Sequence, residues 1–322
     1  MTLSFVIPVY NERETLAALV EGIEEYAGDA LAEIWLIDDG STDGSAETMR
    51  ALAAKHAAVR VVRFRRNVGK SAALAAGFSR ARGDIVFTLD ADLQDEPKEI
   101  PTFLTKLAEG HDLVCGWKHV RHDPWHKTFP SHIYNGFVAR IFNLPLHDVN
   151  CGYKAMRRRV AKEIRVYGDL HRLIPVLAAE RGFDVTEIPV EHQPRRFGKS
   201  KYGLERFSKG ALDVLTVWFL RHRLYSPNHY FGKWGVVAWV GGAMLAALST
   251  WLLLSADAVG WRGLAVFGLV ASVSMMTAGP LLLAVGLVAE LLVRDLEYVD
   301  PEVYVAEVYG DEAGDSFVGG GG

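Results

Sequence analysis

Cysteine is scarce in this chain, which argues against a metal site built from thiolates. The two cysteines, Cys115 and Cys151, show no metal-ligand spacing, and we expect both to be reduced residues of a cytosolic domain. A positively charged leader with a cleavable apolar run is also lacking, because Thr2–Ile7 reads directly into a strand. We therefore expect no signal peptide and a cytoplasmic N-terminal part.

An excess of charge of one sign is missing too. The formal net charge is -4, half of the residues are hydrophobic and 23% are charged. This balance excludes a disordered chain. It provides no global attraction to nucleic acid, although local basic patches remain open. The 322 residues suffice for one large domain or two ordinary ones.

Charge is absent from two long stretches of the C-terminal third, residues 234–256 and 263–289. As helices, stretches of this length would span about 35 and 40 Å, more than the roughly 30 Å core of a bilayer. We predict two membrane-spanning helices that form a hairpin, because the link between them is short. A pair of buried core helices is the alternative.

Basic residues lie mainly at the two ends of the predicted hairpin. Arg221, Arg223 and Lys233 precede the first span and Arg294 follows the second, whereas only Arg262 lies in the link. The positive-inside rule then places both ends of the hairpin in the cytoplasm. Residues 205–223 mix aromatic and basic side chains, which suits an amphipathic helix on an anionic membrane surface; packing on the domain is the alternative.

Strand and helix patterns alternate through residues 1–116. The expected strands are Leu3–Pro8, Glu33–Asp38, Val59–Phe64, Asp84–Leu89 and Asp112–Gly116. The expected helices are Arg13–Tyr26, Gly44–His56, Ser71–Arg82 and Lys98–Glu109. Repeated β-α-β units predict a mostly parallel sheet with helices on both faces. Residues 117–200 are less regular, with a helix expected over Ser131–Phe142 and a strand over Val185–Val190.

Polar clusters follow three of these strands, at Tyr10–Glu12, Asp38–Ser41 and Asp90–Gln94. Parallel sheets bind ligands beyond the carboxyl ends of their strands, so we expect the clusters to converge on one edge. Strand alternation puts Asp90 and Asp92 on one side, with Gln94 next in step. Three oxygen donors suit a hard divalent cation. A solvated acidic turn is the alternative, and the convergence of the clusters favours the metal.

Glycine-rich phosphate motifs are absent. The chain has no G-x-G-x-x-G at its first turn and no G-x-x-x-x-G-K-[ST], which argues against a dinucleotide oxidoreductase or a P-loop ATPase. The carboxylates of Asp38–Gly44 are instead placed to accept hydrogen bonds from a base or ribose. A metal at the fourth strand would then hold a diphosphate, so the simplest ligand is a nucleotide-diphosphate donor.

Basic residues in the later loops are candidates to neutralise phosphate. The favoured ones are Lys118, Lys127, Arg195 and Lys201, with Arg196 and Lys199 less favoured. A solvated surface charge is the commoner role of any single lysine or arginine. The clustering of these residues in loops beside glycine and serine favours phosphate binding.

Several motifs together resemble those of glycosyltransferase family 2. They are Ile7–Glu12, Asp38–Gly44, Arg66–Lys70 and Leu89–Asp95. Asp148–Lys154, the Arg195–Tyr202 loop and the two predicted spans narrow the resemblance to polyprenyl-phosphate glycosyltransferases, the relatives of dolichyl-phosphate mannose synthase. The resemblance covers residues 3–203 closely. It implies the GT-A nucleotide-sugar fold, which is α/β and Rossmann-like, followed by interfacial and transmembrane helices.

The resemblance also implies residue roles. The nucleotide-sugar site would comprise Pro8, Tyr10, Glu12, Ile37, Asp39, Asp90, Ala91, Asp92, Arg195 and Lys201. Asp90, Asp92 and Gln94 would hold Mg²⁺ or Mn²⁺, and Asp148 would act with Asp90 and Asp92 in catalysis. Lys118, Lys127 and Ser131 would receive the lipid phosphate. Lysine stands at 118 and 127 where arginine is expected, and lysine cannot grip a phosphate bidentately.

The resemblance therefore implies an inverting transferase. It would move one sugar from a UDP- or GDP-linked donor to undecaprenyl or dolichyl phosphate at the cytoplasmic membrane face. A processive polysaccharide synthase is one alternative, because Gln193–Phe197 superficially resembles a Q-x-x-R-W motif. Phe197 replaces the tryptophan, however, and two spans are too few for a translocation pore. A catalytically silent nucleotide- or lipid-binding scaffold is the other alternative.

We expect four parts along the chain. They are a catalytic domain over residues 1–203, juxtamembrane helices over 204–229, the hairpin over 230–295 and a cytoplasmic tail over 296–322. Small residues at 241–247 allow close helix contact in lipid. The tail segment Glu302–Tyr309 is rich in strand-forming residues and would pair with a sheet edge of its own subunit or of a neighbour. We expect a homo-oligomer, for example a tetramer, with the tail crossing between subunits.

Overall fold

The computed structural model of the protein divides into two compact units. The first comprises Met1–Leu215 together with Val299–Gly322, and the second comprises Thr216–Tyr298. The structure describes residues 1–119, 135–136, 138–191, 193, 227–255, 259–295 and 305–309.

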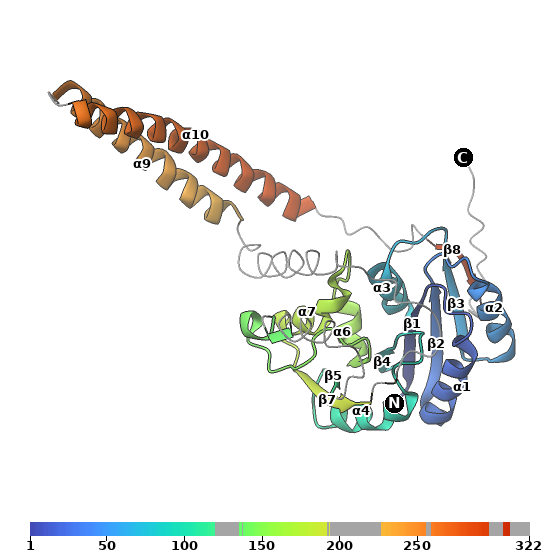
Figure 1. Ribbon diagram of the computed structural model, residues 1–322. Coiled ribbons are helices and arrows are strands. Elements are labelled where there is room, and N and C mark those ends of the chain that lie inside the picture. The colour runs from blue at the N-terminus through green and yellow to red at the C-terminus, as the bar shows by residue number, and fades with distance from the viewer. Residues whose placement is uncertain are drawn as a thin grey trace. The chain divides into compact units, whose positions relative to one another are not determined.

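A mixed sheet of eight strands forms the centre of the first unit, in the order β7-β5-β6-β4-β1-β2-β3-β8 (Figure 1). The strands are β1 (Leu3–Val9), β2 (Leu31–Asp38), β3 (Val59–Phe64), β4 (Ile85–Thr88), β5 (Leu113–Lys118), β6 (Lys154–Arg157), β7 (Val185–Val190) and β8 (Val305–Tyr309). Strands β4, β1, β2 and β3 are parallel to one another, and β5 is parallel to β7. The α/β fold class predicted from the sequence is confirmed.

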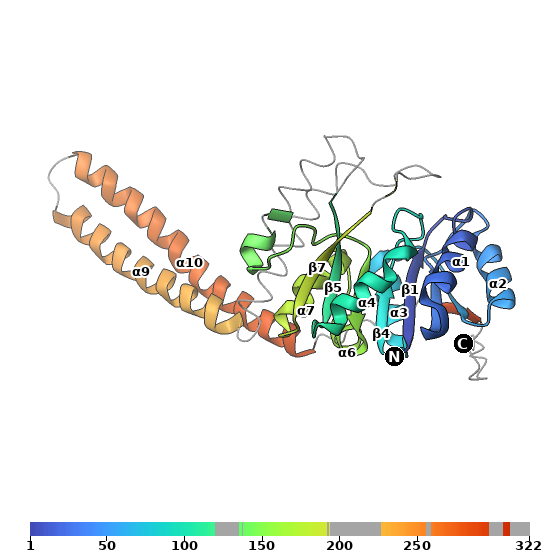
Figure 2. The ribbon, with the colours of Figure 1, turned by 90° about the horizontal axis from the view of Figure 1, so that it is seen from below.

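Helices cover both faces of this sheet (Figure 2). They are α1 (Leu16–Ala27), α2 (Ser45–Lys55), α3 (Lys70–Arg80), α4 (Ile100–Ala108), α6 (Arg158–Glu163) and α7 (Ile174–Glu180). Short 3-10 turns lie at Gly28–Ala30, Pro97–Glu99 and Leu170–Leu173. Within residues 1–116 every expected helix and strand is present, with ends that differ by a few residues.

Side-chain alternation along β1 builds two separate cores. Phe5 and Ile7 belong to a cluster with apolar residues of α1, α2 and α4. Val6 belongs to a second cluster with residues of α3, α6 and α7. At about 25 cal/mol per Å² of buried apolar surface, these two layers are the main source of stability of the unit.

Strand β6 is an element that the sequence did not reveal, as are helices α6 and α7. Strand β6 lies between β4 and β5 and runs antiparallel to both. Its first residue, Lys154, is buried and donates from Nζ to the carbonyl oxygen of Cys151. A buried lysine in a strand of four residues hides the apolar pattern by which a strand is recognised.

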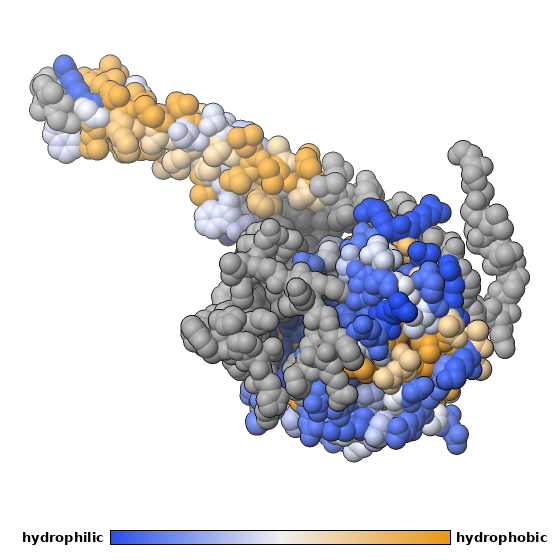
Figure 3. Space-filling model, turned by 45° about the vertical axis from the view of Figure 1, so that its right-hand side comes forward, coloured by the Kyte–Doolittle hydropathy of each residue, from blue (hydrophilic) through white to orange (hydrophobic). Residues whose placement is uncertain are grey.

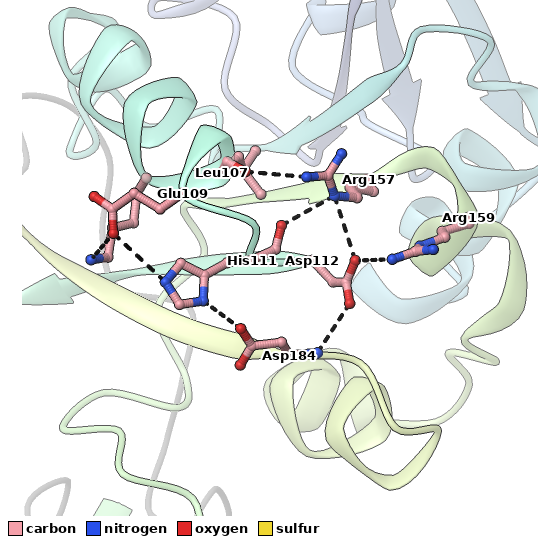
Figure 4. A network of polar contacts seen from close by, with 8 residues as sticks. Leu107, Glu109, His111, Asp112, Arg157, Arg159 and Asp184 are labelled. Carbon is pink, nitrogen blue, oxygen red and sulfur yellow. Dashed lines mark hydrogen bonds and ion pairs between the residues drawn. The ribbon is translucent and has the colours of Figure 1, made fainter.

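A polar network joins β5, β6 and β7 at the edge where β5 and β7 begin (Figure 4). Arg159 Nη2 and the amide of Asp184 donate to the carboxylate of Asp112, the latter at 3.1 Å. Arg157 Nη2 donates to the carbonyl oxygen of Leu107 at 3.2 Å, and His111 Nδ1 lies 2.6 Å from Asp184 Oδ2. These contacts fix the end of the sheet opposite to the carboxyl ends of β5 and β7.

The second unit contains two long apolar helices, α9 (Pro227–Ser255) and α10 (Val259–Asp295). Their stretches Tyr230–Ser255 and Trp261–Ala289 are long and apolar enough to cross a membrane, and only a small share of their apolar residues is buried. Figure 3 shows this mostly apolar surface. The two predicted apolar helices are therefore confirmed as helices.

Glycines bring α9 and α10 close together. A Cβ added to Gly235 would lie 2.7 Å from the carbonyl oxygen of Gly279, and one added to Gly242 would lie 2.9 Å from Met276 Cγ. The small residues of the first span thus make contacts inside the hairpin of one chain. The expected homo-oligomer stays a prediction.

The tail contributes a strand to the sheet, as its composition indicated. β8 pairs antiparallel with β3, with Val308 opposite Val62. The sequence did not decide whether this strand would pair with a sheet edge of its own subunit or of a neighbour. In the structure β8 pairs with the edge of its own chain.

Candidate active site

The first two polar clusters lie side by side because β1 and β2 are adjacent and parallel. The amide of Asn11 donates to Ser41 Oγ at 3.0 Å, and Asn11 Oδ1 accepts from the amide of Thr42 at 2.7 Å. Ser45 Oγ accepts from the amide of Glu12 at 3.1 Å. Asn11 has a φ of 54°, a conformation that asparagine tolerates better than most residues. The predicted convergence of these clusters is thereby explained by direct hydrogen bonds.

The Arg66–Lys70 motif joins the same edge through Gly40 and Asp39. A Cβ on Gly40 would lie 2.6 Å from the backbone nitrogen of Asn67, so only glycine fits there. Asp39 Oδ1 accepts from the amide of Val68 at 2.7 Å, and Asp39 Oδ2 from that of Gly69 at 2.9 Å. Burial raises the pKa of Asp39 despite these hydrogen bonds, which act to lower it. The carboxylate expected to meet the nucleoside thus also holds the start of α3.

Asp90, in the third cluster, forms an ion pair with Lys70. Lys70 Nζ contacts Asp90 Oδ1, and the two side chains are 23% and 33% exposed. On another side, a Cβ added to Gly152 would lie 2.7 Å from Asp90 Oδ2. Thr88 Oγ1 donates to the carbonyl oxygen of Gly152 at 2.7 Å and fixes this close approach.

Asp92 and Gln94 form a tight turn around Leu93, whose φ is 56°. Asp92 Oδ1 accepts from the amide of Gln94 at 3.2 Å. Gln94 Nε2 donates to the carbonyl oxygen of Gln193 at 3.2 Å. The side-chain amide of Gln94 is therefore engaged through its nitrogen, which leaves oxygen as the atom that would ligate a cation.

Lys118, expected to receive the acceptor phosphate, lies beside a buried carboxylate. Its Nζ is 3.3 Å from Asp95 Oδ1, and the Asp95 side chain is fully buried. Burial acts to lower the pKa of Lys118, but Asp95, Asp90 and Asp148 outweigh it and raise that pKa. Lys118 is thus charged and held in place by surrounding acids.

Asp148 is buried and fixed from several directions. Its Oδ1 accepts from Asn135 Nδ2 at 3.2 Å and from the amide of Asn150 at 3.3 Å. Glu187 on β7 accepts from the amide of His147 at 2.7 Å and so holds the preceding residue. The same turn leads to Gly152, which connects Asp148 to the surroundings of Asp90.

The remaining expected residues divide into three groups. Tyr10 is 37% exposed, and Pro8 and Glu12 are partly exposed at the same edge. The side chains of Ile37 and Ala91 are buried in the two cores and are not exposed to a ligand. Arg195, Lys201, Lys127, Ser131 and the segment 205–223 lie outside the described residues.

The sequence did not indicate a role for Lys70 or Gly152, two further residues of the site. Both stand in motifs that the sequence displays, but their contacts with Asp90 depend on tertiary folding. One signal was available for Lys70, because a cation in the first turn of a helix opposes the helix dipole.

The donor set fits a divalent cation such as Mg²⁺ or Mn²⁺. Within the described part of the chain no three His, Cys, Asp or Glu side chains are grouped to hold a metal, so Asp90 and Asp92 would need Gln94 and non-protein ligands. Such oxygen-rich, incomplete protein shells suit these cations. Two features of Asp90 support the fit: the Lys70 ammonium already places a positive charge on it, and glycine at 152 leaves space beside it.

Comparisons with known proteins show the family to which the chain belongs. Residues 4–165 match the family described as Glycosyl transferase family 2. Dodecaprenyl-phosphate galacturonate synthase of Rhizobium johnstonii (strain DSM 114642 / LMG 32736 / 3841) is 32% identical, over 97% of this chain and 94% of that protein. Undecaprenyl-phosphate 4-deoxy-4-formamido-L-arabinose transferase of Pseudomonas aeruginosa (strain LESB58) is 36% identical, over 91% and 85%.

A solved structure shares the fold. Glucosyl-3-phosphoglycerate synthase from Mycobacterium tuberculosis, in complex with Mn²⁺, uridine diphosphate and phosphoglyceric acid, superposes with a TM-score of 0.54 at 21% identity. The match covers 68% of this chain and 78% of that one. At this identity the likeness shows the fold alone.

Proposed function

Because the chain belongs to glycosyl transferase family 2, we propose that it transfers a single sugar from a nucleotide-diphosphate sugar to a polyprenyl phosphate. The observation that carries the proposal is the length of the similarity to polyprenyl-phosphate sugar transferases. It extends over 91–97% of this chain and thus includes the two apolar helices as well as the acidic turn. A lipid acceptor accounts for those helices, because the enzyme must bind this substrate at a membrane.

The residues around Asp90 would bind the donor. Asp90, Asp92 and the Gln94 oxygen would hold Mg²⁺ or Mn²⁺, which when bound neutralises the departing diphosphate. Pro8, Tyr10, Glu12 and Asp39, with the backbone of Ile37 and Ala91, would surround the nucleoside. Arg195 and Lys201 would contact the diphosphate. The Mn²⁺ and uridine diphosphate named for the mycobacterial synthase are consistent with this assignment.

The acceptor would be the nucleophile. A phosphate oxygen forms the new bond to the anomeric carbon while the bond from that carbon to the diphosphate breaks, and the configuration inverts. A phosphate monoester has a second pKa of about 6, so it is already ionised near neutral pH and needs no strong general base. The protein's task is then to position the two substrates.

Lys118, Lys127 and Ser131 would receive the acceptor phosphate. Of these, Lys118 is described, and its ion pair with Asp95 holds its ammonium in one place. Asp148 would orient the acceptor or the donor through the turn that its own hydrogen bonds stabilise. These roles rest on the motif positions, together with the burial of Asp148.

The membrane topology completes the proposal. Helices α9 and α10 would cross the membrane as a hairpin, with the catalytic domain and both termini in the cytoplasm. The basic residues on either side of the hairpin and the single Arg262 in its link support this orientation.

The experiment is an incubation of the purified protein with a panel of UDP- and GDP-sugars and with undecaprenyl or dolichyl phosphate. Mass analysis of the lipid should reveal one added sugar. A polymer would identify a processive synthase instead. Binding of nucleotide without any product from the whole panel would favour a silent scaffold.

A further inference from the structure

Lys70 occupies a position that its helix does not favour. It is the first residue of α3, where the helix dipole repels a cation. The Asp39 carboxylate already provides negative charge at the start of that helix, where it accepts hydrogen bonds from the amides of Val68 and Gly69. The requirements of the helix therefore give no reason for a lysine here, and the reason must lie in what the ammonium touches.

The ammonium of Lys70 touches Asp90, one of the two carboxylates assigned to the cation. Lys70 Nζ contacts Asp90 Oδ1, while the close approach of Gly152 confines the Asp90 carboxylate from another side. Both partners of the ion pair remain partly exposed, so a ligand can reach them from solvent. A divalent cation that binds Asp90 must compete with this lysine.

We infer that Lys70 is an exchangeable counter-ion, which neutralises Asp90 in the empty site and moves to a phosphate oxygen of the nucleoside diphosphate when the cation binds. The inference rests on the proposed function in that it takes a nucleoside diphosphate as the ligand. Lysine suits the exchange because its ammonium is a compact charge with three donors on a flexible stem. No bond is made or broken in this step.

A coupling between metal and nucleotide follows from the exchange. The cation alone has to displace Lys70 from Asp90, which costs the ion pair between them, so the cation binds more weakly than it would without the lysine. The nucleoside diphosphate supplies a negative charge for Lys70, and each ligand therefore strengthens the binding of the other by the same factor. Lys70 makes occupancy by the metal depend on the presence of the donor.

The test measures Mn²⁺ affinity of the full chain in detergent, by electron paramagnetic resonance, with and without UDP and in parallel with GDP. Lys70→Met should bind Mn²⁺ alone about five-fold more tightly than wild type, the factor expected for one lost, partly exposed ion pair. The factor by which the nucleotide improves Mn²⁺ affinity should fall. Lys106→Met serves as the control, because Lys106 on α4 pairs at 2.6 Å with Glu109, just beyond the end of that helix, and the variant should match wild type.

Equal Mn²⁺ affinities and an equal nucleotide factor in Lys70→Met and wild type would overturn the inference, as would wild type that fails to bind Mn²⁺ with either nucleotide. Lys70→Arg keeps the positive charge and should keep most of the competition. The two proposals fail separately. Loss of coupling in Lys70→Met without any sugar transfer by wild type would refute the function only, whereas transfer by wild type with unchanged coupling would refute the exchange only.

Discussion

Gln94 and Gln193 are joined by two hydrogen bonds. The amide of Gln193 donates to the carbonyl oxygen of Gln94 at 3.0 Å, and Gln94 Nε2 donates back to the carbonyl oxygen of Gln193 at 3.2 Å. Gln193 directly precedes the basic segment that contains Arg195 and Lys201. The acidic turn and the root of the basic segment are therefore one connected piece of structure.

Substitution of Gln94 should separate its two roles. Gln94→Glu keeps an oxygen for a cation but removes the nitrogen that donates to Gln193. We expect it to keep Mn²⁺ binding and to lower kcat/KM for the donor about five- to ten-fold, the cost of one lost hydrogen bond. Gln94→Ala should lose both properties. Steady-state kinetics with Mn²⁺ titrations would contradict this if Gln94→Glu retained the donor kcat/KM of wild type.

Asp92→Ala should abolish turnover and leave the fold intact. Asp92 lies in the turn after β4, where its carboxylate accepts a hydrogen bond from the amide of Gln94, and it belongs to neither apolar cluster of the sheet. The measurement is sugar transfer to lipid together with thermal unfolding, with the exposed Asp29→Ala as control. Near-normal activity of the variant, or full wild-type activity in excess chelator, would exclude the metal role.

Gly152→Ala should damage the site without unfolding the protein. The new Cβ would meet both oxygens of the Asp90 carboxylate, at 2.7 and 2.8 Å, and would displace that side chain. We expect kcat to fall about ten- to a hundred-fold, because small displacements of catalytic groups are costly. Gly263→Ala is the matched control, because its Cβ would meet nothing within 4 Å. Equal activity of both variants would show that the position of Asp90 is uncritical.

Asp112 should make the domain less stable at low pH. Burial acts to raise the pKa of Asp112, but hydrogen bonds from Arg159 and the amide of Asp184 outweigh it and hold the pKa below its ordinary value of 3.8. A carboxyl with a depressed folded-state pKa stabilises the protein above its unfolded pKa, and this contribution is lost as pH falls through the folded pKa.

We therefore expect the Tm of wild type to drop more steeply below about pH 4 than that of Asp112→Asn. At pH 7 Asp112→Asn should be less stable by about 1–2 kcal/mol, because it loses charge-assisted hydrogen bonds. Glu25→Gln, an exposed change on α1, should follow the wild-type curve. If Tm fell with pH in the same way for wild type and Asp112→Asn, Asp112 would not be the cause of the pH dependence.

Removal of residues 298–322 should expose the β3 edge. The chain would lose the β8 pairing, and we expect a Tm lower by about 4 °C together with a greater tendency to aggregate. Full-length protein is predicted to be a homo-oligomer in detergent, as its mass would reveal. Monomers for both forms would refute the assembly, whereas the same oligomer for both would show that the tail does not hold subunits together.

The sequence predicts much of the fold where each element carries its own periodic pattern. Strands β1 to β4 and helices α1 to α4 are of this kind, since Val59–Phe64 or Leu16–Ala27 display their buried faces directly. β6 was not predicted because a buried lysine, Lys154, interrupts its apolar pattern. The Nζ of Lys154 donates to the carbonyl oxygen of Cys151. The pairing of β8 with β3 rather than with another subunit depends on long-range geometry that composition does not encode.

In the site too, features within one segment could be predicted, whereas contacts between distant segments could not. Asp90, Asp92 and Gln94 were predicted from strand alternation, but β4 ends at Thr88 and the three residues lie in the turn that follows it. The ion pair of Asp90 with Lys70 and its contact with Gly152 join segments that only the folded sheet brings together. Sequence reasoning assigned Asp39 to the nucleoside, and the structure adds that its oxygens hold the start of α3.

The pairing of β8 with β3 changes how the apolar hairpin is attached. Residues on both sides of α9 and α10 belong to the first unit, so the hairpin is an insertion rather than a terminal appendage. A single protease cut in residues 194–226 would break the covalent path on one side only. The hairpin would then remain bound to the first unit through the backbone hydrogen bonds of one five-residue strand. The hairpin is thus attached twice, once by the chain and once by the sheet.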